Sequence, residues 1–144
     1  MIYTPMTKKA MKLMFEKQKN QVDKSGLPYI FHPFHVAEQM KNEVTTIVAL
    51  LHDLLEDTEV TVAELEQMGF TKEVTDALKT LTRTKTENYF DYIRRIGENP
   101  VARAVKIKDL EHNMDLTRLE QISERDLERL EKYKKSYQYL MKIE

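Results

Sequence analysis

Helical periodicity with few interruptions is the feature that most constrains the fold of this chain. The 144 residues contain only three Gly and four Pro, and apolar side chains recur every three or four residues between them. No run of alternating apolar and polar residues predicts a β-strand. The sequence therefore predicts an all-α fold, a compact single-domain helical bundle that covers residues 1–144.

Capping residues and helix breakers place the individual helices. We expect helices over residues 5–20, from Pro33 to about residue 41, and from residue 44 to residue 56, with residues 29–31 extended. Further helices are expected from Thr61 to near residue 69, from Thr71 to residue 81, from the end of the 82–88 loop to residue 98, from Pro100 to about residue 119, and after Ser123, which forms a capping box with Asp126. The apolar stripe expected on the last helix is Leu127, Leu130, Tyr133, Tyr137, Leu140 and Met141.

Composition excludes several classes of function. Cysteine is absent, which rules out disulfides, thiolate metal sites and a cysteine nucleophile. With 23 Lys and Arg against 24 Asp and Glu, the chain lacks the basic excess of a nonspecific nucleic-acid binder. The longest apolar run, residues 47–51, is too short for a membrane span, and the first residues do not resemble a signal peptide. We therefore expect a cytoplasmic protein with no nucleic-acid or membrane partner.

The most informative segment is residues 45–57. On a continuous helix, His52, Asp53, Glu56 and Asp57 would fall within an arc of roughly 140°, backed by large aliphatic side chains. A solvated acidic face on a surface helix is the ordinary alternative. Clustered carboxylates repel one another unless a cation or proton is present, however. Asp oxygen and neutral imidazole nitrogen suit a hard or borderline divalent cation.

Two further polar groups fall where a core is expected. Asp109 shares the apolar side of its helix with Lys106 and Asn113. A buried carboxylate must meet a cation, a metal or several donors, so the alternatives are a metal site and a structural ion pair with Lys106. His32 lies at a turn–helix junction, from which a side chain can point into a cleft, although His32 and His35 could also be ordinary half-buried histidines. The sequence alone assigns no role to His112.

Three segments carry a resemblance to a known family. They are Gly-Leu-Pro-Tyr-Ile-Phe-His-Pro at residues 26–33, Ala-Leu-Leu-His-Asp-Leu-Leu-Glu-Asp-Thr at 49–58, and Val-Lys-Ile-Lys-Asp at 105–109 with His-Asn-Met at 112–114. The chain resembles the HD superfamily of metal-dependent phosphohydrolases. It is most similar to the hydrolase domain of the bifunctional RelA/SpoT alarmone enzymes and to their small stand-alone relatives. The resemblance spans roughly residues 8–120, and no synthetase domain is expected in this chain.

The resemblance implies a function and a set of site residues. The family removes pyrophosphate from the 3′ position of guanosine tetra- or pentaphosphate, the nucleotides of the stringent response. Its four metal ligands, usually holding manganese, correspond to His32, His52, Asp53 and Asp109. Its catalytic acidic pair corresponds to Glu56 and Asp57, and its substrate-binding positions to Lys24, Ser25 and Asn113. The metal would activate a bound water, and the acidic pair would orient that water or move its proton.

The chain also departs from the family pattern. Asp23 replaces an Arg that packs on guanine, Leu27 replaces an acidic residue, Leu110 replaces an Arg, and Asp115-Leu116 replaces an Arg-Thr pair. These departures leave open an HD-type nucleotide or phosphomonoester phosphohydrolase with another substrate, and a noncatalytic nucleotide-binding module.

Two surface features also allow more than one interpretation. Arg83 and Lys85 could meet substrate phosphates, although a solvated loop explains these two basic residues at least as well. The tyrosines of the last helix, Tyr133, Tyr137 and Tyr139, could complete the core or form a homodimer surface.

Overall fold

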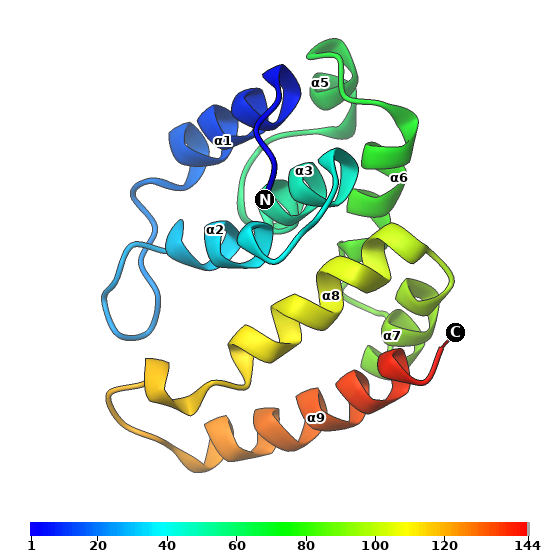
Figure 1. Cartoon of the computed structure of the whole chain (residues 1–144). Coiled ribbons are helices and arrows are strands. Elements are labelled where there is room, and N and C mark those ends of the chain that lie inside the picture. The colour runs from blue at the N-terminus through cyan, green and yellow to red at the C-terminus, as the bar shows by residue number, and fades with distance from the viewer. Residues whose placement is uncertain (144) are drawn as a thin grey trace.

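A computed structural model describes residues 1–143 and confirms the all-α fold (Figure 1). Its helices are α1 (Pro5–Gln18), α2 (Phe31–Glu38), α3 (Glu43–Leu51), α4 (Leu54–Asp57), α5 (Val62–Gln67), α6 (Lys72–Leu81), α7 (Tyr89–Gly97), α8 (Pro100–Asn113), the 3₁₀ helix η1 (Leu116–Arg118) and α9 (Glu124–Met141). No strand occurs within residues 1–143, where one isolated bridge joins Val22 to Pro28.

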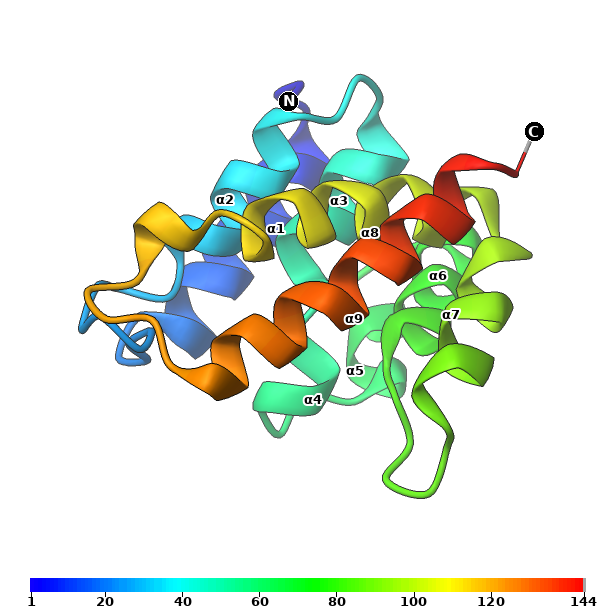
Figure 2. The same cartoon turned by 90° about the horizontal axis from the view of Figure 1, so that it is seen from below.

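Helix α3 forms the centre of the core. It packs against α1, α2, α6 and α8, and α9 lies across α8 and α7 (Figures 1 and 2). The side chains of Val48, Leu50 and Leu51 are fully buried. Truncating one such leucine to alanine typically costs about 2–5 kcal/mol. This packing fixes the two ends of α3, and the second end carries His52.

The helix starts follow the capping chemistry that the sequence predicts. The Thr61 hydroxyl accepts a hydrogen bond from the Glu64 N–H, and Ser123 and Asp126 form the expected capping box. Thr71 precedes α6 as predicted, but its hydroxyl caps no backbone N–H. These caps satisfy N–H groups that have no partner inside a helix, and each is worth about 1 kcal/mol.

The single helix predicted over residues 44–56 is wrong. Helix α3 ends at Leu51 and α4 begins at Leu54, so His52 and Asp53 lie in the turn between them. The His52 Nδ1–H donates to the Ala49 carbonyl at 2.6 Å, and this carbonyl is the acceptor that Asp53 N–H would use in a continuous α-helix. The imidazole thereby replaces a backbone bond at the point where the helix breaks.

Three other expectations need correction. Residues 29–31 are not extended, because Phe31 opens α2 and Ile30 already has helical dihedrals; α2 ends at Glu38 rather than near residue 41. The helix expected to reach residue 119 ends at Asn113, because the Asp115 carboxylate accepts the Thr117 N–H and starts η1 instead.

The apolar stripe of α9 is shorter than predicted. Leu140 is fully buried and Tyr133 and Tyr137 pack against the core, so this part of the helix completes the core. Leu127 and Met141 are instead exposed by 48% and 55%, at the two ends of the helix beyond the packed region.

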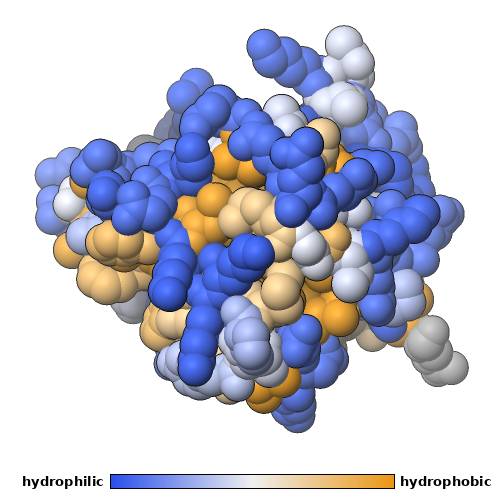
Figure 3. All heavy atoms as spheres, turned by 90° about the horizontal axis from the view of Figure 1, so that it is seen from above, coloured by the Kyte–Doolittle hydropathy of each residue, from blue (hydrophilic) through white to orange (hydrophobic). Residues whose placement is uncertain are grey.

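Polar side chains cover much of the upper face of the molecule (Figure 3). On the face shown in Figure 3, exposed apolar side chains form patches among polar ones. Within residues 1–143, no helix combines the length and the apolar character that crossing a membrane requires.

Candidate metal centre and adjoining pocket

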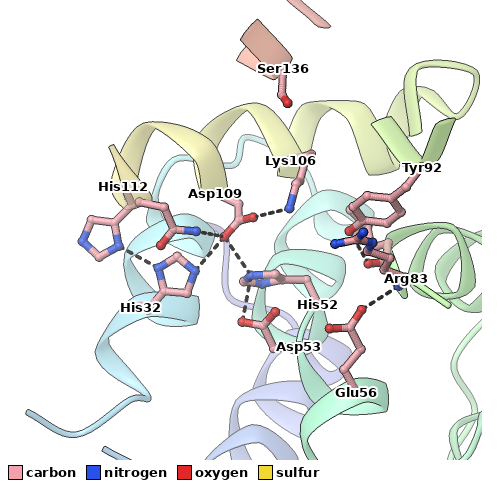
Figure 4. A network of polar contacts seen from close by, with 12 residues as sticks. His32, His52, Asp53, Glu56, Arg83, Tyr92, Lys106, Asp109, His112 and Ser136 are labelled. Atoms are coloured by element: carbon pink, nitrogen blue, oxygen red, sulfur yellow. Dashed lines mark hydrogen bonds and ion pairs between the residues drawn. The ribbon is translucent and has the colours of Figure 1, made fainter. Parts of the chain in front are cut away.

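Three buried side chains from separate elements meet beneath α8. His32 comes from α2, His52 from the α3–α4 turn and Asp109 from α8, and one potential ligand atom of each lies within 4.8 Å of the others (Figure 4). Asp109 Oδ1 lies 2.8 Å from His32 Nε2 and 3.3 Å from His52 Nε2. Three of the four predicted metal ligands therefore come together, and all three are buried.

His52 shows why this group fits a cation. Because Nδ1 donates to a backbone carbonyl, Nε2 of the neutral ring carries a lone pair. That buried nitrogen has no hydrogen-bond partner within residues 1–143, and it lies 3.1 Å from Asp53 Oδ2 and 3.3 Å from Asp109 Oδ1. A lone pair among carboxylate oxygens is repulsive unless a proton or metal ion lies between them. Burial lowers the pKa of His52, but the two carboxylates outweigh burial and hold it well above its usual range.

Asp53 lies beside this group rather than within it. Its Oδ2 atom approaches His52 Nε2 at 3.1 Å and accepts a hydrogen bond from the Tyr29 hydroxyl. Burial raises the pKa of Asp53, but neighbouring His52 reverses the effect and lowers it. The carboxylate is thus ionised and oriented toward the cluster, and its role as a fourth ligand stays a prediction.

Asp109 contacts Lys106 and also the two histidines of the candidate metal site, so both alternatives from the sequence are present. Its Oδ2 accepts from Lys106 Nζ at 2.9 Å, and its Oδ1 accepts from Asn113 Nδ2 at 3.1 Å as well as facing the two histidines. Burial alone would raise the pKa of Asp109, but Lys106 and the histidines hold it well below its usual range. The structural ion pair and the ligand cluster therefore share one carboxylate.

His112, which the sequence left without a role, supports His32 from behind. The two Nδ1 atoms lie 2.7 Å apart and the planes of the two rings differ by only 3°. The ring of His35 stacks on that of His112 at 4.0 Å between centroids. Burial and then the Arg118 guanidinium lower the pKa of His112 to about 3, so the ring stays neutral. The sequence could have indicated this role of His112 only through its position, three residues after Asp109 on the same helix.

The predicted acidic pair lies on α4, directly after Asp53. Glu56 Oε1 accepts the Arg83 backbone N–H at 2.6 Å. Partial burial, followed by the charges of Asp53 and Glu56, raises the pKa of Asp57 to about 6. A carboxyl group with such a pKa can give or take a proton near neutral pH.

A pocket of about 400 Å³ opens beside the cluster. It is bounded by the loop after α1, the segment around η1 and the first turns of α9, and it contains all three predicted substrate residues. Lys24 Nζ pairs with Asp126 Oδ1 at 3.0 Å, and Ser25 Oγ donates to the Arg118 carbonyl at 2.7 Å. Tyr29 and Asn113 line the pocket and also bond Asp53 and Asp109, so they connect the pocket with the cluster.

The departure at Asp23 has a structural role. Its Oδ1 accepts the backbone N–H groups of Ser25 and Leu27 at 2.9 and 3.0 Å, closing a turn in which Gly26 has φ of 79°. Only glycine adopts this left-handed conformation without strain. Asp23 therefore shapes the pocket loop and offers the pocket no cation for stacking on a base.

Sequence comparisons find relatives of two names, guanosine-3′,5′-bis(diphosphate) 3′-pyrophosphohydrolase and GTP pyrophosphokinase. The chain is 36% identical over 114 residues to the guanosine-3′,5′-bis(diphosphate) 3′-pyrophosphohydrolase MESH1 of Mus musculus, covering 71% of this chain and 63% of that protein. It is 34% identical over 106 residues to the Aquifex aeolicus protein of the same activity, covering 65% of this chain and 15% of that one. It is 33% identical over 121 residues to the GTP pyrophosphokinase rsh of Brucella melitensis, covering 74% and 16%.

The fold comparison finds a similar structure. A solved structure described as a metazoan ortholog of SpoT that hydrolyzes ppGpp superposes with a TM-score of 0.79 at 22% identity, covering 99% of this chain and 89% of that one. No family model matches the chain. The chain spans only about 15–16% of the length of the bacterial relatives.

Proposed function

The chain resembles HD-type (p)ppGpp hydrolases in sequence and in fold, and from this premise we propose that it is a metal-dependent phosphohydrolase. Its reaction is the release of pyrophosphate from the 3′ position of guanosine-3′,5′-bis(diphosphate). The observation that carries the proposal is the buried His52 Nε2, which has no hydrogen-bond partner within residues 1–143 and lies among carboxylate oxygens, next to a pocket large enough for a nucleotide.

The proposed ligand set is His32, His52, Asp53 and Asp109, with Mn²⁺ as the proposed ion. Nitrogen and carboxylate donors without thiolate suit such a divalent ion. When bound, the ion would polarise a phosphoryl oxygen and lower the pKa of a coordinated water. His112 and Tyr29 hold His32 and Asp53 in place through the contacts described above, which is the usual task of groups behind metal ligands.

In this proposal Asp57 transfers the proton and Glu56 supports it. Asp57, whose pKa is raised to about 6, accepts a proton from the attacking water in this proposal and can return it to the ribose 3′ oxygen. Glu56 is tied to the Arg83 backbone, so it is fixed in orientation and contributes negative charge that keeps the Asp57 pKa high.

Lys24, Ser25 and Asn113 are proposed to bind the nucleotide, because all three line the pocket. A nucleotide phosphate can replace Asp126 as the partner of Lys24. Under this proposal residues 1–144 form one HD-type domain that acts in the cytoplasm on an alarmone of the stringent response. Homodimerisation through the exposed side of α9, which carries Tyr139, stays a prediction for sedimentation analysis.

A second candidate is hydrolysis of another nucleotide. It is favoured by Asp23, whose carboxylate is committed to its own loop at the position where relatives stack an Arg on guanine. Base recognition in this pocket would then rely on apolar contacts such as those of Val22 and Leu119.

The test is identification of the products from guanosine tetraphosphate with Mn²⁺, for the wild type and for Asp53→Ala. We expect GDP and pyrophosphate from the wild type and loss of turnover in the variant. An undiminished rate in the variant would refute the mechanism. Release of orthophosphate, or turnover of other nucleotides only, would favour the second candidate. Tight binding without turnover would identify a noncatalytic module.

A further inference from the structure

A group of basic side chains lies on the far side of His52 from His112. In Figure 4, Arg83 and Glu56 lie on one side of His52 and His112 on the other. Lys132 of α9 joins Arg83 there, because both cations approach the ring of Tyr89. The Lys132 Nζ atom is 4.4 Å and the Arg83 Cζ atom 5.2 Å from the centroid of that ring.

Neither Arg83 nor Lys132 forms an ion pair in the part of the chain that the structure describes. Burial, then the positive charges of Arg83, Arg129 and Lys106, lower the pKa of Lys132. The Tyr89 hydroxyl is buried without a hydrogen-bond partner among residues 1–143, and such a group normally has one.

Two chains of contacts connect this group with the metal ligands. The first runs through Lys106, whose Nζ bonds Asp109 and lies 5.5 Å from the ring centroid of Tyr92. The ring centroids of Tyr92 and Tyr89 are 6.0 Å apart. Along the other, the Arg83 backbone bonds Glu56 on the short helix after Asp53. Lys132 also lies 5.6 Å from the ring of Tyr133, a wall of the pocket.

We propose that Arg83, Lys132 and Tyr89 form an anion subsite that binds the pyrophosphate group of the substrate and retains it briefly as product. The inference rests on the proposed hydrolysis of a nucleotide 3′-diphosphate. Arg can grip a phosphate through two parallel N–H bonds, and Lys adds a point charge. Because Tyr133 lines the pocket and its ring lies 5.6 Å from Lys132 Nζ, a nucleotide in the pocket can extend its 3′-diphosphate toward the two cations.

The probe is inorganic pyrophosphate, titrated calorimetrically into the full chain with equal free Mn²⁺ in cell and syringe. The variants are Arg83→Gln and Lys132→Gln. Lys134→Gln is the matched control, because Lys134 lies on the same helix, is exposed and pairs with Glu131. We expect each test variant to weaken pyrophosphate binding about tenfold, as loss of a charge-assisted bond does, with Lys132→Arg restoring most of it and the control unchanged.

The outcomes separate this inference from the proposed function. If the test variants lose thermal stability but keep wild-type affinity for pyrophosphate, the cations only pack on Tyr89 and the inference is overturned. The same conclusion follows if the wild type does not bind pyrophosphate. If pyrophosphate binding depends on Arg83 and Lys132 but guanosine tetraphosphate is not turned over, the subsite stands and the proposed function fails.

Discussion

Replacing Lys106 by Met tests whether Asp109 depends on a buried ion pair. The Lys106 and Asp109 side chains are only 14% and 6% exposed, and their charged atoms lie 2.9 Å apart. Removing one partner of a buried pair leaves an uncompensated charge and costs about 3–5 kcal/mol. Asp109 keeps its contacts with His32, His52 and Asn113, so we expect the lower end, about 3 kcal/mol, in metal-free protein. For a chain of this length that loss lowers Tm by roughly 10 °C.

The matched control is Lys108→Met on the same helix. Lys108 forms an ion pair of the same spacing with Glu111, also at 2.9 Å, but its side chain is 36% exposed and that of Glu111 is 37% exposed. A surface pair contributes about 0–1 kcal/mol, so this variant should change Tm by only a few degrees.

The assays are urea unfolding, which gives the free energy, and thermal unfolding, which gives Tm, both followed by circular dichroism with and without Mn²⁺. Mn²⁺ should recover part of the loss in Lys106→Met, because a metal ion replaces the missing positive charge beside Asp109. Equal, small losses in the two variants would refute the reasoning that the Asp109 carboxylate needs its buried partner.

The remaining predictions concern the cluster and the acidic pair. His112→Ala should weaken Mn²⁺ binding about 10–100-fold in equilibrium titrations, since it removes the group that orients His32; wild-type affinity would contradict this. Asp57→Asn should remove the limb near pH 6 from the pH–rate profile. The folded-state pKa of Asp57 is raised to about 6, so ionising this carboxyl group lowers the stability of the metal-free wild type as pH rises from about 4 to 6. Because Asp57 is partly exposed, we expect this loss to be about 1 kcal/mol or less. Asp57→Asn should not show it. If the free energies of unfolding of variant and wild type differed by the same amount at every pH, the raised pKa of Asp57 would be contradicted.

The fold class followed from the sequence because local signals agree along the chain. The capping residues Thr61 and Ser123 mark helix starts that the structure contains, and the aliphatic run of α3 is buried in the core. Helix ends were harder to predict. The break at His52 depends on a side chain that takes a backbone acceptor, and no periodicity of apolar residues records this competition.

The candidate site was predictable in part for a similar reason. His32, His52 and Asp109 stand out by residue type and by the resemblance, and the structure brings them together. The contacts of His112 and Lys132 depend on which helices pack side by side. Lys132 reaches Tyr89 only because α9 folds back over α7, and this packing cannot be predicted from spacing along either helix.

We propose that the buried cluster holds one divalent ion and that hydrolysis depends on this ion. The most direct measurement follows Mn²⁺ binding and pyrophosphate release from guanosine tetraphosphate together, on protein freed of metal with EDTA and then dialysed. We predict one Mn²⁺ per chain, release that rises in parallel with occupancy, and loss of both in His52→Ala. Pyrophosphate release without metal, or full Mn²⁺ binding by His52→Ala, would show that this cluster is not the metal site on which hydrolysis depends.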